Sequence, residues 1–293
     1  MQAIKVVGLS KNYEKFVAVD NITFNVEQGD FFGFIGPNGA GKTTTIKSML
    51  GLLQPNQGKV QLLGEDITKN TFQQDLGYIP GEANLYDNLK VGEQIRYFAH
   101  YYKSIDQGYL KQLKQTFEIN ENKKIGELSL GNKKKVAIIC SLMNKPKLLV
   151  FDEVSNSLDP LMQKALFDEL IRLNKKGVTI FYSSHNLEEV QTYCKNVAII
   201  RSGKIIKIDS VEKIVASVGV QVTIKTKDML DELFLAQHKV QPTVLASGAI
   251  TFVYKGNINA LIHSIAKHHL SSIRIADVKL ENIFEEYYRG DEQ

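Results

Sequence analysis

The length and composition of this chain are those of an ordinary globular protein. It has 293 residues, of which 43% are hydrophobic and 23% are charged, so a disordered chain is excluded and one large domain plus a small one is expected. The formal net charge of +4 is small and the lysines are spread along the chain, which does not indicate a nucleic-acid partner. A modest basic bias is equally compatible with an anionic membrane surface.

Two further features bear on the cellular compartment. Cys140 and Cys194 lie in predicted helices among apolar neighbours, which indicates buried thiols in a reducing compartment rather than a disulfide framework. The sequence shows no basic-plus-apolar leader, and no uncharged apolar run approaches the roughly 18 residues of a membrane-spanning helix. We therefore expect a cytoplasmic protein that takes part in membrane processes only through a partner.

The front of the chain is predicted to be rich in strands. Strand-like apolar runs lie at residues 3–9, 22–26 and 31–35. A glycine-rich loop follows, and helical spacing then runs over residues 43–50. Lys42 therefore lies in the first turn of a helix, where the dipole favours an anion over a cation, so we expect something negative to be bound there.

The middle of the chain changes from helices to strands. Helical patterns run from about residue 84 to residue 145, with candidate helices at 91–103, 106–117 and 130–144. In the last of these, Lys133, Lys134 and Lys135 are interpreted as a solvated face. Strands return at 148–151, 178–182 and 197–201. This alternation predicts a mainly parallel α/β sheet that carries a helical insert.

Beyond Asp209 the pattern changes again. The predicted order is a strand at 220–226, a helix at 228–237, a hairpin at 244–254, a helix at 258–269, a strand at 271–275 and a helix at 280–288. We therefore predict two domains: a large one over residues 1–212, whose helical part covers about 84–145, and a small α+β accessory domain over 213–293.

The glycine-rich loop carries the first chemical motif. GPNGAGKT, residues 36–43, satisfies GxxxxGK[ST] after a strand and before a helix. In this context backbone N–H groups point at phosphate oxygens, Lys42 reaches the terminal phosphates and the Thr43 hydroxyl ligates Mg²⁺. The expected phosphate-binding residues are Gly36, Pro37, Asn38, Gly39, Ala40, Gly41, Lys42, Thr43 and Thr44. The alternative is a glycine turn that joins strand to helix and binds nothing.

A pair of adjacent carboxylates forms the second motif. LLVFDE, residues 148–153, is an apolar run suited to a strand buried on both faces, and it ends in Asp152 and Glu153. Ligands of open α/β sheets gather at that end of the strands. Asp152 is expected to hold Mg²⁺ directly or through water, and Glu153 to accept a proton from a water that attacks a γ-phosphate. On their own the two residues are equally compatible with a solvated turn.

In their order along the chain, these motifs resemble the ATP-binding subunits of ABC transporters over residues 1 to about 210. The resemblance implies a P-loop ATPase fold with a mainly parallel sheet, an N-terminal antiparallel β part and a helical insert. It also implies ATP and Mg²⁺ as cofactors, with Lys42, Glu153 and His185 as the catalytic residues.

Further positions take their roles from the resemblance alone. Tyr13 matches the aromatic residue that stacks on adenine, and His185 matches the switch histidine at the γ-phosphate. Ser129 and Gly131, in LSLGN, match the signature that contacts a nucleotide held by the opposite subunit, and Asp159, in SLDP, matches a residue at the subunit interface. The alternatives are structural: a strand-end tyrosine, a packed histidine, and two helix starts at Ser129 and Asp159.

Some positions depart from the family. The family usually has glutamine where this chain has Gly81 and Asn132, glycine where it has Leu130, and proline where it has Val154. These departures affect Mg²⁺ binding and the rate of turnover. Glu82 follows Gly81 and brings a hard oxygen ligand of the kind that Mg²⁺ favours. Our hypothesis is that Glu82 partly replaces the missing glutamine. The alternative is an exposed loop carboxylate without a metal.

The function implied by the resemblance is an ATPase subunit that drives export through a separate multispan membrane permease, on the inner face of the cell membrane. In the family the phosphate loop and the signature of one chain face different nucleotides, so a complete site needs a second ATPase subunit, and a homodimer is favoured. The helical insert at 84–145 is expected to dock the permease. LENIFEEYY, residues 280–288, is similar to the ending of ATPases that serve exporters of drugs, antimicrobial peptides and lipids.

Two other functions stay open. A degenerate subunit that binds ATP and gates a partner with little hydrolysis is compatible with Gly81 and Leu130, whereas Glu153 and His185 argue against it. An ABC ATPase that acts on ribosomes or DNA usually carries a second cassette, a coiled coil or extra basic segments, and the sequence shows none of these.

Overall fold

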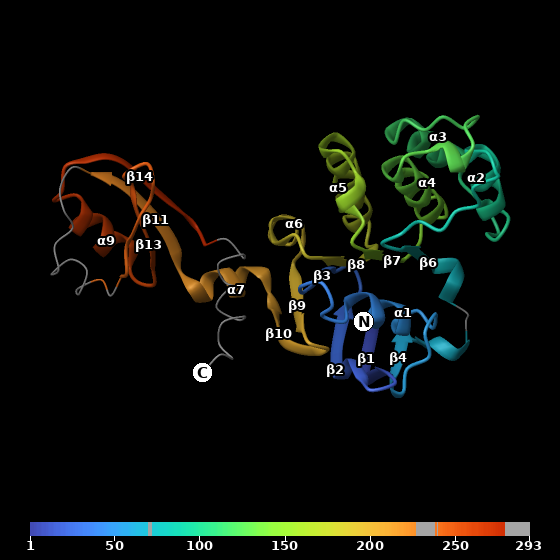
Figure 1. Cartoon of the computed structure of the whole chain (residues 1–293), viewed down its shortest axis with the longest axis horizontal. Helices are drawn as coiled ribbons and strands as arrows, with labels where there is room; N and C mark the ends of the chain where they lie inside the picture. The colour runs from blue at the N-terminus through green and yellow to red at the C-terminus, as the bar shows by residue number, and fades with distance from the viewer. Residues whose placement is uncertain (70–71, 227–237, 239, 279–293) are drawn as a thin grey trace. The chain divides into compact units, whose positions relative to one another are not determined.

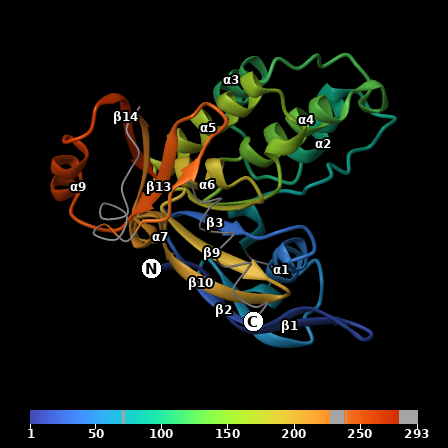
Figure 2. The same cartoon turned by 60° about the vertical axis from the view of Figure 1, so that its left-hand side comes forward.

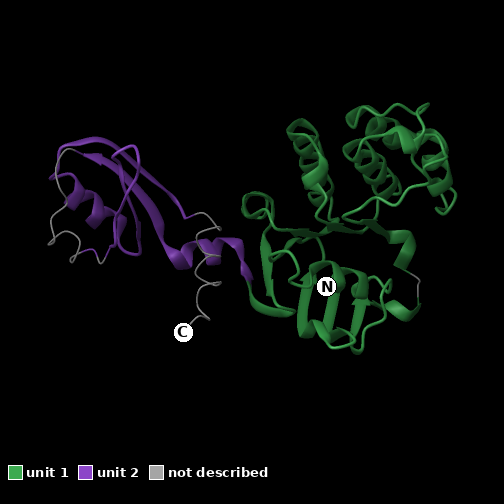
Figure 3. Cartoon of the chain, in the orientation of Figure 1, with its two compact units in different colours: residues 1–208 green, residues 209–293 purple. Residues whose placement is uncertain are grey.

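The computed structural model describes residues 1–69, 72–226, 238 and 240–278. The chain divides into two compact units, residues 1–208 and 209–293 (Figure 3). The division falls after Ile208, a few residues before the boundary expected at 212, and helix α7 begins at Val211. Within the described ranges, no helix has both the length and the apolar character needed to cross a membrane.

A six-stranded sheet forms the centre of the first unit. Its strands, in order, are β10 (Lys204–Ser210), β9 (Asn196–Arg201), β3 (Phe31–Ile35), β8 (Thr179–Ser184), β7 (Leu148–Asp152) and β6 (Leu76–Ile79). The pairs β9–β3, β3–β8, β8–β7 and β7–β6 are parallel, which confirms the predicted sheet. Every residue of β3, β7 and β8 is buried, which explains their continuous apolar runs. Their carboxyl ends meet at one edge of the sheet, where ligands of α/β proteins bind.

A second, antiparallel sheet covers the N-terminal part. Its strands, in order, are β2 (Phe16–Glu27), β1 (Gln2–Tyr13), β4 (Gln57–Leu62) and β5 (Glu65–Asp66). The predicted runs at 3–9 and 22–26 belong to one long hairpin, whose tip pairs Tyr13 with Phe16. Only Val60 and Leu62 of β4 are buried, so no apolar run marked this strand in the sequence.

Helix α1 (Lys42–Met49) contacts both sheets of the first unit (Figure 1). It packs on β7 of the six-stranded sheet and on β1, β2 and β4 of the antiparallel sheet. The rings of Phe24, Phe32, Phe34 and Phe181 join the two sheets directly, with centroid separations of 5.3 to 6.2 Å. This apolar contact fixes the hairpin beside the glycine loop, because Phe24 belongs to β2 and Phe34 to the strand that enters the loop.

Helices cover the opposite face of the six-stranded sheet. Those that contact its strands are α4 (Leu130–Leu142), α5 (Pro160–Asn174) and α6 (Leu187–Tyr193), and α2 (Val91–Ala99) and α3 (Gln107–Thr116) pack on α4. Figures 1 and 2 show α4 and α5 on the side of the sheet away from α1. The predicted helices at 91–103, 106–117 and 130–144 correspond to α2, α3 and α4, each shorter at its end. Short 3-10 turns lie at Ile67–Lys69, Phe72–Asp75, Ile125–Glu127 and Ser155–Ser157 (η4).

The second unit is a small α+β arrangement. Its described elements are α7 (Val211–Val218), β11 (Val220–Thr226), β12 (Thr243–Val244), β13 (Ile250–Tyr254), α9 (Ile258–Ile265) and β14 (Leu270–Asp277). The strands form an antiparallel sheet in the order β12-β13-β11-β14, and Leu261 and Ile265 of α9 pack in one core with Val222 and Phe252. The helices expected at 228–237 and 280–288, including the LENIFEEYY motif, lie outside the described residues.

Candidate functional site

The glycine loop leads directly into α1, as the sequence predicts. Gly41 precedes the helix with a φ of 103°, a conformation that favours glycine. A Cβ atom at position 41 would lie 2.5 Å from the carbonyl oxygen of Ala18, so no other residue fits. The close approach of Gly41 to β2 places the hairpin against the loop. The loop is also tied to the start of β10, since the Gly203 amide donates to the carbonyl of Ala40.

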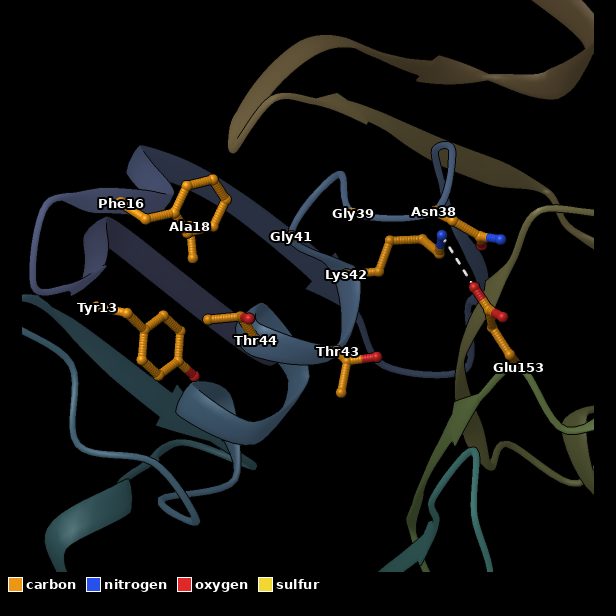
Figure 4. Close-up of a pocket in the computed structure, with 10 residues that line it drawn as sticks. All are labelled: Tyr13, Phe16, Ala18, Asn38, Gly39, Gly41, Lys42, Thr43, Thr44 and Glu153. Atoms are coloured by element: carbon orange, nitrogen blue, oxygen red, sulfur yellow. Dashed lines mark ion pairs between the residues drawn. The ribbon is translucent and has the colours of Figure 1, made fainter.

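Lys42 extends back over the loop that precedes it. Its Nζ donates to the carbonyl oxygens of Gly36 at 2.7 Å and Pro37 at 2.9 Å. It also forms an ion pair with Glu153 Oε1 at 2.9 Å (Figure 4). The residue is only 5% exposed, so its charge lies at the helix start and requires negative partners. Within the chain, the Glu153 carboxylate is the negative partner of Lys42, and the expectation of a bound anion stays a prediction.

A cavity of about 320 Å³ lies beside Lys42. Its lining residues are Tyr13, Phe16, Ala18, Asn38, Gly39, Gly41, Lys42, Thr43, Thr44 and Glu153 (Figure 4). Phe16 and Ala18 were not predicted, since they approach the loop only because the β1–β2 hairpin folds over it. Tyr13 and Phe16 are 47% and 63% exposed, and their rings lie at one end of the cavity, with the ammonium of Lys42 at the other.

Asp152 is the last residue of β7 and is 2% exposed. Burial raises the pKa of its carboxyl group, and a hydrogen bond from the Thr43 hydroxyl opposes that rise. The Oδ1 atom is buried and has no hydrogen-bond partner within the described part of the chain. An unpartnered carboxylate oxygen beside a hydroxyl suits Mg²⁺, which binds through one or two protein oxygens and keeps several waters. The described residues contain no cluster of three His, Cys, Asp or Glu side chains that could hold a metal alone.

Glu153 lies between Lys42 and His185. Its Oε2 is 3.4 Å from Nδ1 of His185, and its Oε1 pairs with Lys42. The backbone amide of Glu153 donates to the carbonyl of Ser183 at 3.0 Å, which joins the ends of β7 and β8. Glu153 has a φ of 51°, a left-handed conformation that is unfavourable for a non-glycine residue and that clusters at functional sites.

Lys134 corrects one prediction. A solvated face was expected for Lys133, Lys134 and Lys135, but Lys134 is only 2% exposed. Its Nζ donates to the carbonyl oxygens of Pro80, at 2.9 Å, and Gly81. Burial lowers the pKa of Lys134, and the negative charges of Asp152 and Glu82 oppose that effect. The prediction failed because α4 packs against β6, which turns this lysine toward the loop after β6.

Gly81 and Glu82 lie on that loop. A Cβ atom at Gly81 would lie 3.3 Å from the backbone oxygen of Asp152, so the position borders the metal candidate. Glu82 itself is exposed and does not line the cavity. Its negative charge acts on Lys134, whose pKa it raises against the effect of burial. The hypothesis that Glu82 ligates Mg²⁺ therefore stays a prediction.

Ser129, Gly131 and Asp159 do not line the cavity of their own chain. Ser129 caps α4 by accepting from the amide of Asn132, and Asp159 caps α5 by accepting from the amide of Met162. A Cβ at Gly131 would lie 2.6 Å from the carbonyl oxygen of Ser157, so the start of α4 packs tightly on turn η4. These residues thus have structural roles within their own chain. Their predicted contact with a nucleotide of the opposite subunit stays a prediction.

Comparisons with known proteins agree on one family. A family model described as ABC transporter matches residues 19–156. The chain is 35% identical to the uncharacterized ABC transporter ATP-binding protein YhaQ of Bacillus subtilis (strain 168), over 79% of this chain and 78% of that protein. It is 37% identical to the bacitracin transport ATP-binding protein BcrA of Bacillus licheniformis, over 70% of this chain and 68% of that protein. A solved ATP-binding subunit of an ABC transporter superposes with a TM-score of 0.68 and 29% identity, over 73% of this chain and 92% of that one.

Proposed function

This chain belongs to the family of ABC transporter ATP-binding proteins, and from this we propose that it hydrolyses ATP to drive export through a separate membrane permease. The observation that carries the proposal is the convergence of Lys42, Glu153 and His185 at the mouth of the glycine loop. Export is favoured over import because a relative from Burkholderia pseudomallei, 33% identical over 67% of this chain, carries the name Nod factor export ATP-binding protein I.

The residues of the cavity divide between the two ends of ATP. Tyr13, assisted by Phe16, takes the adenine, and the loop amides and Lys42 take the phosphates. Asp152 and the Thr43 hydroxyl would hold Mg²⁺, which neutralises charge on the phosphates when it is bound. Glu153 accepts a proton from the attacking water, and the nearby imidazole of His185 orients that water.

The proposal of a dimer rests on motif residues that do not line the cavity of their own chain. Ser129, Gly131 and Asp159 do not line the site of their own chain, although the family motif assigns them to a nucleotide contact or to the subunit interface. We therefore propose that they meet the nucleotide site of a second ATPase subunit, most simply a second copy of this chain. Each dimer would then hold two ATP molecules at its interface.

The helical part of the first unit is the proposed docking surface for the permease. A cavity of about 560 Å³ on α2 is lined by Leu89, Glu93, Arg96, Tyr97, His100 and Tyr101. Tyr97 and Tyr101 are 40% and 61% exposed, and large exposed aromatic side chains mark interaction surfaces. Docking there would hold the protein on the inner face of the cell membrane.

A second candidate function is a subunit that binds ATP and gates its partner with little hydrolysis. Two observations favour it: Gly81 has no side chain toward Asp152, and Leu130 in the signature is 78% exposed. The geometry at Glu153 and His185 favours hydrolysis instead.

Two measurements test the proposal. Wild-type chain is expected to bind and hydrolyse Mg·ATP, whereas Lys42→Ala removes the one side-chain charge aimed at the phosphates and is expected to weaken binding by about a hundredfold. Affinity near wild type at physiological salt would remove the phosphate-loop assignment. Copurification from detergent-solubilised membranes is expected to yield a multispan protein, and recovery of ribosomes or DNA instead would overturn the transport role.

A further inference from the structure

Three buried hydroxyl groups converge on one carboxylate oxygen in the first unit. Glu189 Oε2 lies 2.6 Å from the hydroxyl of Tyr182, 3.0 Å from that of Ser155 and 3.2 Å from that of Ser184. Glu189 is 9% exposed, and the three hydroxyl-bearing residues are at most 2% exposed. We call these four residues the carboxylate network. Buried polar groups that are fully satisfied in this way hold their segments rigidly.

The network joins the two segments that carry the proposed catalytic residues. Ser155 begins turn η4, two positions after Glu153. Tyr182 and Ser184 lie at the end of β8, immediately before His185, and Glu189 lies on α6, which follows that histidine. Ser184 Oγ also accepts from the amide of Asn186 at 2.9 Å, so the backbone on both sides of His185 is fixed.

Turn η4 carries the connection further. The amide group of Gln163, on α5, donates to the carbonyl oxygens of Ser155 at 3.0 Å and Leu158 at 3.1 Å. Gly131, at the start of α4, packs on the carbonyl of Ser157. A displacement of η4 would therefore move the loop that contains Asp159 as well as the base at Glu153.

The chemistry of the network suits fixed positioning rather than proton transfer. Burial and the nearby charge of Glu189 raise the pKa of Tyr182 well above its ordinary value, so its hydroxyl stays a donor. Three donors to one charged oxygen give charge-assisted hydrogen bonds, which are stronger than neutral ones. The side chains of Glu189, Tyr182, Ser155 and Ser184 do not line the nucleotide cavity, so none of them contacts the proposed substrate.

We propose that Glu189 is a positioning residue for ATP hydrolysis. It fixes the segments that carry Glu153 and His185 relative to each other, so that both side chains can contact the same attacking water. The inference rests on the proposed function, because it assigns Glu189 a role in that reaction. ATP binding depends on the glycine loop and the hairpin, which the network does not touch, so Glu189 controls turnover rather than affinity.

The first test compares Glu189→Gln with wild type in the full chain. The change keeps the shape but removes the charge, so we expect kcat to fall about tenfold while the Kd for Mg·ATP changes less than about twofold. In the free protein, amides of residues 153–159 and 183–189 are expected to exchange hydrogen about tenfold faster. If the wild-type chain hydrolyses ATP and Glu189→Gln has the same kcat, the role of Glu189 is overturned. Unchanged hydrogen exchange in both residues 153–159 and residues 183–189 would overturn it as well.

Glu169→Gln is the matched control. Glu169 is also a buried carboxylate, 7% exposed, that accepts from a tyrosine hydroxyl, here Tyr109 at 2.5 Å, and it also pairs with Arg172. Its loss is expected to lower stability but to leave kcat and the exchange of the two segments unchanged. Equal losses of kcat in both variants would mean general destabilisation and would contradict the proposal.

Ser155→Ala distinguishes an effect of the carboxylate network from a general loss of stability. It removes one donor with little change in volume, and it is expected to loosen residues 153–159 without loosening 183–189 and to lower kcat about threefold. The double variant with Glu189→Gln is expected to show less than the product of the two effects, because both disturb one network. Full multiplicativity would overturn the link between Ser155 and Glu189. Absence of hydrolysis by the wild-type chain, in contrast, would overturn the proposed function itself.

Discussion

At the level of single residues, a phosphate group and Glu153 compete for the same ammonium. A lysine ammonium has three N–H donors, and those of Lys42 have the carbonyls of Gly36 and Pro37 and the carboxylate of Glu153 as partners. Under the proposed function, a phosphate that reaches Lys42 is expected to displace Glu153, which would then be available to a water near His185. Phosphate binding and release of the base would then be one event.

Glu153→Gln tests this competition. The amide cannot accept a proton, so hydrolysis is expected to fall by about a hundredfold or more. Because Lys42 loses an anionic partner, we also expect ATP to bind about threefold more tightly, and a dimer with ATP at both interfaces to accumulate. Titration of a fluorescent ATP analogue and single-turnover hydrolysis measure the two effects.

Glu118→Gln is the control for that variant, since Glu118 is exposed and shares the left-handed backbone of Glu153, with a φ of 51°. It is expected to behave as wild type in both measurements. Normal turnover by Glu153→Gln would show that the base lies elsewhere.

Glu82 poses a different question, because it is exposed and its negative charge acts on the pKa of Lys134. If it partly replaces the missing glutamine, Glu82→Ala is expected to raise the Mg²⁺ concentration for half-maximal hydrolysis about threefold and to reduce permease-stimulated activity more than basal activity. The measurements are a Mg²⁺ titration and the stimulation ratio with reconstituted permease. A match to wild type in both would show that Glu82 does not take part in Mg²⁺ binding or in coupling to the permease.

At the level of elements, tyrosines in α2 and on both sides of it form a connected surface. The hydroxyls of Tyr97 and Tyr101 lie 2.8 Å apart, and Tyr86 packs edge-on against Tyr97 with centroids 5.3 Å apart. Replacing Tyr97 and Tyr101 by alanine is expected to reduce permease-stimulated hydrolysis about tenfold, because aromatic anchors dominate interfaces, and to leave basal hydrolysis unchanged.

The control is Leu52→Ala, at a residue 63% exposed in the loop after α1. Both variants are compared for copurified permease and for the stimulation ratio. A double tyrosine variant that keeps full stimulation would remove α2 as the docking surface.

The turn between β2 and β3 carries a buried charge whose effect depends on pH. Asp30 is 8% exposed, its Oδ1 has no partner in the described ranges, and burial is the main cause that raises its pKa above 3.8. As the pH falls through the raised pKa of Asp30 toward 3.8, the folded chain binds a proton that the unfolded chain does not yet bind. The stability of the fold therefore rises. At neutral pH the ionised group is destabilising.

Asp30→Asn is therefore expected to raise the thermal midpoint at pH 7, and the gain is expected to shrink as the pH falls toward 3.8. Asn196 can still donate to the remaining oxygen, as it does at 2.7 Å to Asp30. Calorimetry from pH 4 to pH 8 measures the trend, with Asp168→Asn on the exposed face of α5 as the control. A midpoint below wild type at pH 7 would show that the hydrogen bond outweighs the cost of burial.

At the level of the whole molecule, the nucleotide cavity belongs to the first unit alone, since all its lining residues lie between Tyr13 and Glu153. The described strands of the second unit have their own core around Val222 and Phe252. A chain that ends after about residue 212, just beyond the last residue of β10, is therefore expected to remain folded and to bind ATP within about twofold of wild type. Isothermal titration measures this, and loss of affinity in a folded truncation would assign part of the site to the second unit.

The sequence by itself determined the glycine loop and the parallel strands β3, β7, β8 and β9, whereas β6 was not predicted. GPNGAGKT is contiguous, and its function depends on local backbone conformation and on the helix that starts at Lys42, so neighbouring residues contain the information. The strands β3, β7 and β8 are buried on both faces, which leaves an unbroken apolar run that any reader of the sequence can find. Strand β4 and helix α6 were missed because exposed residues interrupt their apolar ones, and for α5 the sequence indicated only a candidate start at Asp159.

The tertiary structure alone decided which distant residues meet. Phe16 reaches the cavity through the fold of a hairpin, Lys134 is buried because α4 packs on β6, and Glu153 pairs with Lys42 because β7 lies next but one to β3 in the sheet. The carboxylate network of Glu189 depends in the same way on how β8, α6 and η4 pack together. Burial and pairing of this kind are set by contacts between segments far apart in the chain, and no local pattern of residues records them.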